Sequence, residues 1–194
     1  MLMIASIVVG YLAGSLSAGI IVARIMGLGD PREGGSGNPG TTNLLRLGGK
    51  KAAIITLLAD ALKGVLPVLA AQALGLNSLT LALVGLAAFL GHLYPVFFGF
   101  RGGKGIATGF GVMLAWSLPA GIAALLTWAF IAAVFRLSSL AALVSFSIAP
   151  VYLWGLSAAP TLALASAVMA GLAAWRHRGN IQRLKAGTEP KIGG

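Results

Sequence analysis

This sequence contains no cysteine, and only 4 of its 194 residues are aspartate or glutamate. The absence of thiols excludes disulfides, thiolate catalysis and thiolate metal sites. The two histidines, His92 and His177, are too few to hold a metal ion without carboxylate ligands beside them. We therefore expect a site that uses neither a metal ion nor another cofactor.

Charge of either sign is scarce: 9% of the residues are charged and 58% are hydrophobic, with a mean hydropathy of +0.93. Soluble domains of ordinary composition do not reach such values. The 14 lysines and arginines give a net charge of +10, and in membrane proteins such an excess marks cytoplasmic loops near anionic headgroups rather than nucleic-acid binding. The composition predicts a polytopic membrane protein in the lipid bilayer that binds no nucleic acid.

Long apolar runs define the expected membrane spans, since a helix crosses the hydrocarbon core with about 20 residues. The first run has no basic leader and is longer than a signal h-region, so we interpret it as a retained span. Five runs are clear: Met3 to Ala23, Ala52 to Leu74, Leu79 to Phe98, Ser138 to Leu156 and Thr161 to Trp175.

The uncharged stretch from Ile106 to Phe135 is too long for one ordinary span, and Ser117 to Gly121 predicts a turn in its middle. Two short spans there place nearly all lysines and arginines on one side of the membrane, which is the positive-inside pattern. We therefore predict an all-α protein with seven transmembrane helices, a periplasmic N-terminus and a cytoplasmic C-terminus. Residues 1–194 then form a single domain with cytoplasmic motif segments at 28–51, 99–105 and 176–194.

Two glycine-rich segments carry most of the polar chemistry. The first, Gly34 to Arg46, combines hydroxyls, amides and one guanidinium, and the second places Lys104 between glycines. Glycine leaves backbone amides open to an anion, and cations beside them suit a phosphate group. The alternatives are a solvated helix cap at Thr42 or Asn43 and a simple lysine anchor. The spacing around Lys104 is not that of a Walker A motif, so an NTPase is not indicated.

Three further groups of polar residues stand out. His177 and Asn180 share one face of a helix that continues from the last span. The alternative for the tail around them is a basic flank against anionic lipid. Asp60 and Lys63, three residues apart within a span, are expected to neutralise each other inside the bundle, and His92 is expected to be a satisfied interior histidine.

Taken together, these motifs resemble the bacterial acyl-phosphate:glycerol-3-phosphate acyltransferases. The resemblance covers nearly the whole chain and rests on three segments: Gly35-Ser36-Gly37-Asn38-x-Gly40-x-Thr42-Asn43 with Arg46, Gly91-His92-x-x-Pro95 with Phe100-Arg101-Gly102-Gly103-Lys104-Gly105, and Arg176-His177-x-x-Asn180-Ile181-x-Arg183-Leu184.

The resemblance implies transfer of a fatty acyl group from acyl-phosphate to glycerol 3-phosphate, which yields lysophosphatidic acid and phosphate in phospholipid biosynthesis. It implies a multi-pass protein of the bacterial inner membrane with its active site on the cytoplasmic face. A soluble phosphate acyltransferase that makes acyl-phosphate is a possible partner, and the sequence leaves open whether it docks. The implied catalytic residues are Lys104, Arg46, His177 and Ser36, and the implied substrate-binding residues are Asn38, Thr41, Thr42, Asn43, Gly102, Gly103, Ser139 and Asn180.

Neither histidine is followed five positions later by an aspartate, so the His-Asp pairing of the common glycerolipid acyltransferases is absent. No serine has an evident base beside it, which favours direct transfer without an acyl-enzyme. Two other classes remain as alternatives: a permease for a phosphorylated anion and a lipid-anchoring scaffold. Basic groups gathered at one face argue against a permease, because transporters bind near the bilayer midplane.

Overall fold

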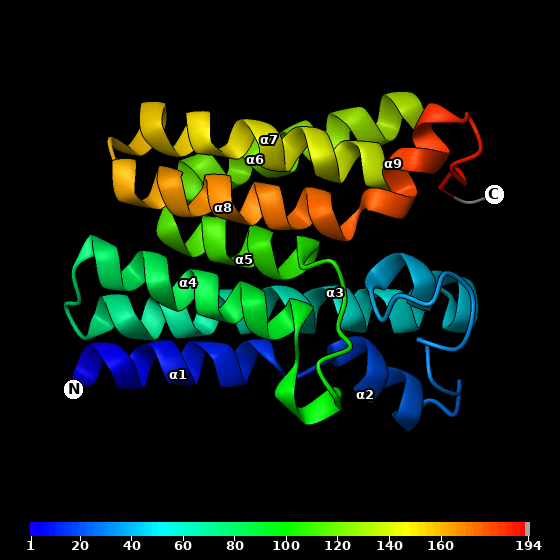
Figure 1. The fold of residues 1–194 in the computed structure, drawn as a ribbon, viewed down its shortest axis with the longest axis horizontal. Helices are drawn as coiled ribbons and strands as arrows, with labels where there is room; N and C mark the ends of the chain where they lie inside the picture. The colour runs from blue at the N-terminus through cyan, green and yellow to red at the C-terminus, as the bar shows by residue number, and fades with distance from the viewer. Residues whose placement is uncertain (193–194) are drawn as a thin grey trace.

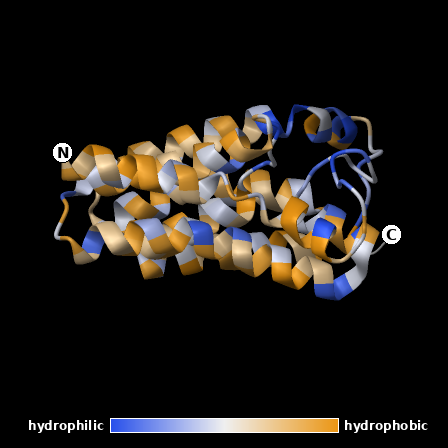
Figure 2. Ribbon diagram, turned by 90° about the horizontal axis from the view of Figure 1, so that it is seen from below, coloured by the Kyte–Doolittle hydropathy of each residue, from blue (hydrophilic) through white to orange (hydrophobic). Residues whose placement is uncertain are grey.

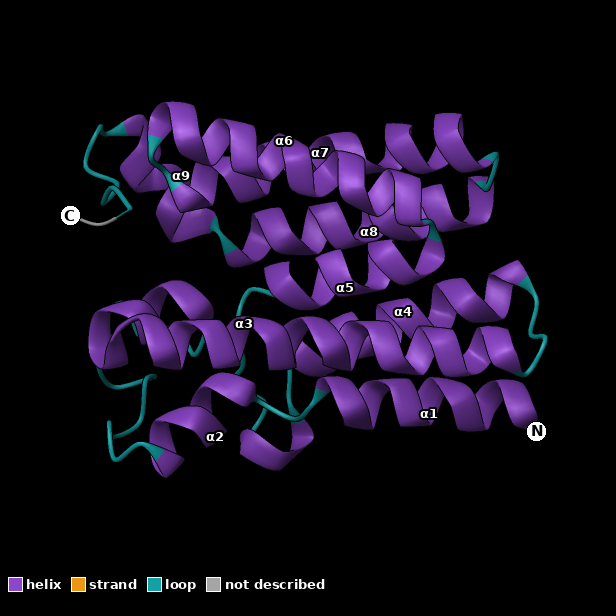
Figure 3. Ribbon diagram, turned by 180° about the vertical axis from the view of Figure 1, so that it is seen from behind, coloured by secondary structure: helices purple, strands orange, loops and turns teal. Residues whose placement is uncertain are grey.

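The computed structural model describes residues 1–192, and no strand occurs among them. Figure 3 shows a bundle of helices joined by short loops. In chain order the elements are α1 (Leu2–Gly14), α2 (Ala18–Ile25), α3 (Thr41–Ala73), α4 (Ser78–Leu93), the 3₁₀ turn η1 (Val96–Phe98), α5 (Ile106–Trp116), α6 (Leu118–Phe135), α7 (Ser138–Ser157), α8 (Pro160–Arg176) and α9 (Arg178–Lys185). The prediction of an all-helical protein is confirmed.

The helices run roughly parallel to the long axis of the molecule (Figure 1). Helix α1 packs on α4, α3 packs on α5, and α7 packs on both α6 and α8. Within residues 1–192, five helical segments are long and apolar enough to cross a membrane. They are Leu2–Ile25, Thr41–Ala73, Ser78–Phe98, Leu118–Phe135 and Ser138–Ser157.

The core lies where α4, α5, α7 and α8 meet. Phe146 of α7 contacts Phe89 and Phe110, with ring centroids 6.2 and 5.3 Å away. Small residues allow the helices to approach closely, as in many membrane bundles. A Cβ on Gly14 would lie 2.0 Å from the carbonyl oxygen of Ala88, so α1 and α4 need glycine there.

The structure differs from the sequence prediction in two of the expected spans. The first span was predicted to be one continuous helix but is broken into two. The span from Met3 to Ala23 stops at Gly14 and restarts at Ala18. At this break Lys63 Nζ donates to the carbonyl of Leu16 at 2.7 Å. The lysine thereby satisfies a backbone group that lies between the two helices.

The second span begins earlier than predicted. Helix α3 starts at Thr41 rather than near Ala52, and Gly49 interrupts it with φ 71° and ψ −169°. The first motif segment therefore includes a short helix, and no side chain caps it: the residue before it is Gly40. The predicted break at Ser117 is confirmed, since α5 ends at Trp116 and α6 begins at Leu118.

Polar residues gather at the end of the bundle where the C-terminus lies (Figure 2). The segment between α2 and α3 and the helix α9 both lie at this end, which is the end away from the N-terminus (Figure 1). The fold thus brings three polar segments, far apart in the chain, to one end of an apolar bundle.

Candidate active site

A hollow of about 400 Å³ opens among the three polar segments. Its lining is mostly polar and includes four basic side chains and no carboxylate. The lining residues are Ser36, Gly37, Asn38, Gly102, Lys104, Arg176, Arg178, Gly179, Asn180, Gln182 and Arg183. Such a composition suits a small, strongly anionic ligand.

The first segment is held by Asn43, which is 1% exposed on the first turns of α3. Its side-chain amide donates to the carbonyls of Pro31 and Gly34 at 2.9 and 3.0 Å. Its Oδ1 accepts from the backbone N–H of Ser36 at 2.8 Å. Asn43 thereby folds the loop around itself, and Ser36 reaches the hollow because this loop is fixed.

Glycine is required where the loop passes Asn43. Gly35 has φ +60°, a region that L side chains rarely adopt, and a Cβ there would lie 2.1 Å from Asn43 Oδ1. The loop is also tied to its neighbour, since Arg32 bonds Asp30 and donates to the Phe98 carbonyl at 2.9 Å. The hydrogen bonds between Arg32 and Asp30 lower the pKa of the Asp30 carboxyl and raise that of the Arg32 guanidinium.

The second segment, Gly102–Lys104, lies against the end of α4. The Gly103 N–H donates to the His92 carbonyl at 3.1 Å. From the other side, Arg176 donates to the carbonyls of Gly103 and Gly102 at 3.1 and 2.8 Å. The same guanidinium lies 5.7 Å from the ring centroid of Tyr94. The loop is thus held between α4 and the end of α8.

A chain of hydrogen bonds links Lys104 to the tail. Lys104 Nζ donates to Asn180 Oδ1 at 2.6 Å, and Asn180 Nδ2 donates to Glu189 Oε1 at 2.6 Å. Glu189 also accepts from Ser139 Oγ at 2.7 Å and from Arg183 Nε at 2.8 Å. Because Glu189 accepts from the Asn180 nitrogen, the Asn180 oxygen is directed to Lys104.

The charges of these groups depend on the surroundings. Burial lowers the pKa of Lys104 to about 8, with the charge of Glu189 acting in the opposite direction and nearby arginines adding to the decrease. Burial would raise the pKa of Glu189, but hydrogen bonds from Ser139, Asn180 and Arg183 outweigh it and hold that pKa below its usual value. Lys104 therefore stays a cation at neutral pH but loses its charge in mildly alkaline solution.

His177 lies at the junction of α8 and α9 and is 2% exposed. Its Nδ1 is 2.8 Å from the Ala173 carbonyl, and since a carbonyl only accepts, Nδ1 carries the proton. Burial and the charge of Lys104 lower the pKa of His177 to about 4. The ring is therefore neutral at pH 7, with Nε2 able to accept a proton.

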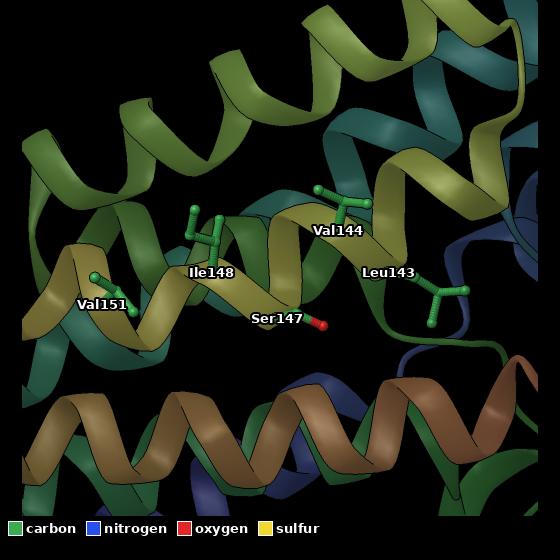
Figure 4. Close-up of a pocket in the computed structure, with 5 residues that line it drawn as sticks. All are labelled: Leu143, Val144, Ser147, Ile148 and Val151. Atoms are coloured by element: carbon green, nitrogen blue, oxygen red, sulfur yellow. The ribbon is translucent and has the colours of Figure 1, made fainter.

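A second concavity, of about 410 Å³, lies on α7 and is lined by Leu143, Val144, Ser147, Ile148 and Val151 (Figure 4). Ser147 supplies its only side-chain hydroxyl. No cationic group is present there to receive an anion. The polar hollow is therefore the candidate active site.

Sequence comparison identifies the relatives of this chain. The family model described as "Glycerol-3-phosphate acyltransferase" matches residues 4–187. The chain belongs to the glycerol-3-phosphate acyltransferase family. It is 55% identical over 193 residues to the glycerol-3-phosphate acyltransferase of Halorhodospira halophila, covering 100% of this chain and 98% of that protein. It is also 55% identical over 194 residues to that of Thioalkalivibrio sulfidiphilus, covering 100% and 96%.

Solved structures agree with this assignment. The crystal structure of PlsY, an integral membrane glycerol 3-phosphate acyltransferase, in its glycerol 3-phosphate form superposes with a TM-score of 0.94 at 38% identity, covering 100% of this chain and 96% of that one. Its lysophosphatidic acid form gives a TM-score of 0.92 at 37% identity, with the same coverage. The chain is accordingly an acyltransferase with a multi-pass membrane fold.

The residues implied by the family resemblance divide into two groups. Ser36, Asn38, Gly102, Lys104 and Asn180 line the hollow. The others lie outside its lining: Arg46, Thr41, Thr42, Asn43, Gly103, Ser139 and His177.

Those outside the lining differ in their surroundings. Arg46 is exposed on α3, and its charge reaches Lys104. Thr42 Oγ1 lies 3.5 Å from Ser138 Oγ, which joins the start of α3 to the start of α7. Thr41 is partly exposed at the first position of α3.

Sequence reasoning missed Arg176, Arg183 and Glu189 as residues of the site. Arg176 belongs to a motif, but its role in holding Gly102 and Gly103 is visible only in three dimensions. One signal for Glu189 existed: it is one of only 4 acidic residues, in a segment otherwise rich in lysine and arginine. Among residues 1–192, no group of three potential ligands could hold a metal ion.

Proposed function

We propose that this acyltransferase moves a fatty acyl group from acyl-phosphate to glycerol 3-phosphate, forming lysophosphatidic acid and inorganic phosphate. The observation that carries the proposal is the hollow itself, lined by Lys104, Arg176, Arg178 and Arg183 without a carboxylate. Both substrates bring a phosphate group, and a phosphate monoester carries nearly two negative charges at pH 7. The related PlsY structures, obtained in glycerol 3-phosphate and lysophosphatidic acid forms, support the acceptor and the product.

The proposed reaction is one direct step of acyl transfer. The primary hydroxyl of glycerol 3-phosphate attacks the acyl carbonyl, the new ester C–O bond forms, and the bond from the acyl carbon to the phosphate oxygen breaks. Acyl-phosphate is a mixed anhydride with a good leaving group, so positioning and charge stabilisation matter more than a strong base. Lys104 and Arg46 offer positive charge to the departing phosphate, and Ser36 with the loop amides offers donors to the carbonyl oxyanion.

The hydroxyl proton ends on the departing phosphate. Two routes lead there. The proton passes to a substrate phosphate oxygen, or it passes first to His177, whose neutral ring can accept it. We favour a mechanism without an acyl-enzyme, because the histidine rings that the structure describes bond Thr108 and Ala173 rather than Ser36 or Ser139.

We further propose roles for the residues implied by the resemblance. Lys104, Arg46, His177 and Ser36 act in catalysis. The proposed substrate-binding residues are Asn38, Thr41, Thr42, Asn43, Gly102, Gly103, Ser139 and Asn180. Two of them act indirectly: Asn43 holds the backbone of the first loop, and Ser139 holds Glu189.

The topology in the membrane determines from which side the substrates reach the site. We propose seven membrane spans, with the N-terminus periplasmic and residues 28–51, 99–105 and 176–194 on the cytoplasmic face of the bacterial inner membrane; residues 193 and 194 lie outside the part of the chain that the structure describes. The clustering of polar residues at one end of the bundle supports this orientation (Figure 2). On that side the site would meet glycerol 3-phosphate from the cytoplasm and acyl-phosphate supplied by a soluble phosphate acyltransferase.

Formation of lysophosphatidic acid by purified protein in detergent tests the function. Glycerol 3-phosphate is supplied with palmitoyl-phosphate, palmitoyl-CoA or palmitoyl carrier protein. We expect product from palmitoyl-phosphate alone, and a loss of about 100-fold in kcat/KM in Lys104→Ala, since one missing charge contact at the reacting centre costs 10²–10³. The exposed Lys185→Ala is the matched control and keeps its activity.

Product from the thioesters would overturn the proposed donor. A protein that consumes no glycerol 3-phosphate in detergent with any of the three donors would contradict the enzymatic proposal. Acyl label that stays covalently on quenched protein after incubation with donor alone would contradict direct transfer.

A further inference from the structure

A cluster of polar side chains is buried inside the bundle, outside the lining of the hollow. Asp60, Lys63 and His92 are 1%, 7% and 6% exposed, and Thr108 is 0% exposed. They come from α3, α4 and α5. Charged groups inside a membrane bundle are costly and are by default tied to function. The proposed chemistry above uses none of these side chains.

The contacts within the cluster join α3, α4 and α5. Lys63 Nζ lies 2.8 Å from Asp60 Oδ1 as an ion pair without hydrogen-bond geometry, and it donates to the Leu16 carbonyl at 2.7 Å. His92 Nδ1 lies 3.5 Å from the same carboxylate oxygen and 3.1 Å from Thr108 Oγ1. The imidazole is therefore held on one edge by a carboxylate and a hydroxyl.

The carbonyl and Nε2 of His92 lie against the Gly102–Lys104 loop. Its carbonyl accepts the Gly103 N–H at 3.1 Å. A Cβ on Gly103 would lie 2.3 Å from His92 Nε2, and a Cβ on Gly102 would lie 2.1 Å from the His92 carbonyl oxygen. The loop backbone thus lies directly against the carbonyl and the ring of His92.

We infer that Asp60, Lys63 and His92 form a positioning cluster that fixes the Gly102–Lys104 loop from inside the bundle and thereby sets the place of the Lys104 ammonium in the hollow. These residues are positioning residues, because they act through Gly103 and line no part of the hollow. The inference rests on the proposed function in one respect, namely that Lys104 binds a substrate phosphate.

The competing explanation is an ion pair that only neutralises itself and stabilises the fold. The double variant Asp60→Asn with Lys63→Met separates the two, because it removes both charges together and leaves neither buried alone. We expect a lower melting temperature, because Lys63→Met also removes the donor to the Leu16 carbonyl. The KM for glycerol 3-phosphate of the folded variant is expected to rise at least about 10-fold, since small displacements of catalytic groups are costly, whereas an ion pair that only stabilises the fold would lower the melting temperature and leave this KM unchanged. A parental KM in the double variant would overturn the inference.

A matched control lies one turn away on the same helix. Thr56 is 0% exposed, and its hydroxyl has no hydrogen-bond partner in the part of the chain that the structure describes. Thr56→Val removes a buried polar atom of α3 without touching His92 and is expected to leave KM unchanged. A rise in KM as large as that of the double variant would mean that any change in this helix disturbs the site.

A second measurement needs no catalysis. The chain has no cysteine, so Arg101→Cys places one spin label at an exposed position beside the loop. We expect a more mobile electron paramagnetic resonance spectrum in the Asp60→Asn/Lys63→Met background than in the parent background. Identical spectra would overturn the inference, whereas failure to use acyl-phosphate would overturn only the proposed function.

Discussion

Lys104 is the residue whose charge responds most directly to pH near neutrality. Burial holds its pKa at about 8, and the charge of Glu189 keeps that pKa from falling further. The lysine is a cation below this pKa, so binding of a phosphate should weaken as the pH rises through about 8. We expect KM for glycerol 3-phosphate to rise about tenfold per pH unit above that point.

Glu189→Gln tests whether the charge of Glu189 sets the pH at which KM begins to rise. Glutamine keeps an oxygen that can accept from Ser139 but removes the charge that raises the pKa of Lys104. The rise of KM should therefore begin at a lower pH than in the parent protein, as measured by the pH profile of initial rates. The exposed Glu33→Gln is the control. An unshifted profile in Glu189→Gln would contradict the electrostatic role of this carboxylate.

The polar residues of the hollow were partly predictable from sequence. The family resemblance implied Ser36, Asn38, Lys104 and Asn180, in segments whose glycines and basic residues indicate phosphate chemistry, and all four line the hollow. Glu189 was missed because its partners lie 50, 9 and 6 residues away. No sequence pattern connects them, because Glu189 lies in the tail beyond α9 and meets Ser139 of α7 and the α9 residues Asn180 and Arg183 only in the folded chain.

At the scale of helices, apolar length predicted the turn at Ser117 and the extent of α7 to within one residue. The breaks at Ser15 and Gly49 were not predicted. A broken helix in an apolar bundle needs distant partners for its backbone, as Lys63 provides for Leu16 at a separation of 47 residues. Hydropathy alone contains no information about such a partner.

The contact between α4 and the glycine loop gives a prediction at this scale. Gly103→Ala places a Cβ 2.3 Å from His92 Nε2, so the loop or the ring must move. We expect kcat/KM to fall about 100-fold, the cost of a displacement near 1 Å. Gly171→Ala is the matched control, because nothing lies within 4 Å of its Cβ and its backbone is helical. Equal losses in both variants would contradict the role of the contact.

The orientation of the whole molecule can be tested with single cysteines, since the chain has none of its own. Ser78 and Lys185 are exposed at the two ends of the bundle. A thiol reagent that does not cross membranes should label Ser78→Cys in cells whose inner membrane is intact, because the positive-inside pattern places this turn outside. Lys185→Cys should react only after that membrane is permeabilised. The reverse pattern would invert the proposed topology.

Helix α5 has only 11 residues, so it rises about 16 Å, roughly half of the hydrocarbon thickness of about 30 Å. It begins well inside the end reached by α3 and α9 (Figure 1). With the proposed orientation, the loop before α5 lies on the cytoplasmic face but deeper than the ends of α3 and α9, so we expect a thinner bilayer to meet it more readily. Reconstitution into lipids of shorter chain length reduces the mismatch between this short helix and the bilayer. We therefore expect membrane thickness to set how easily a water-soluble acceptor reaches an acyl donor embedded in lipid.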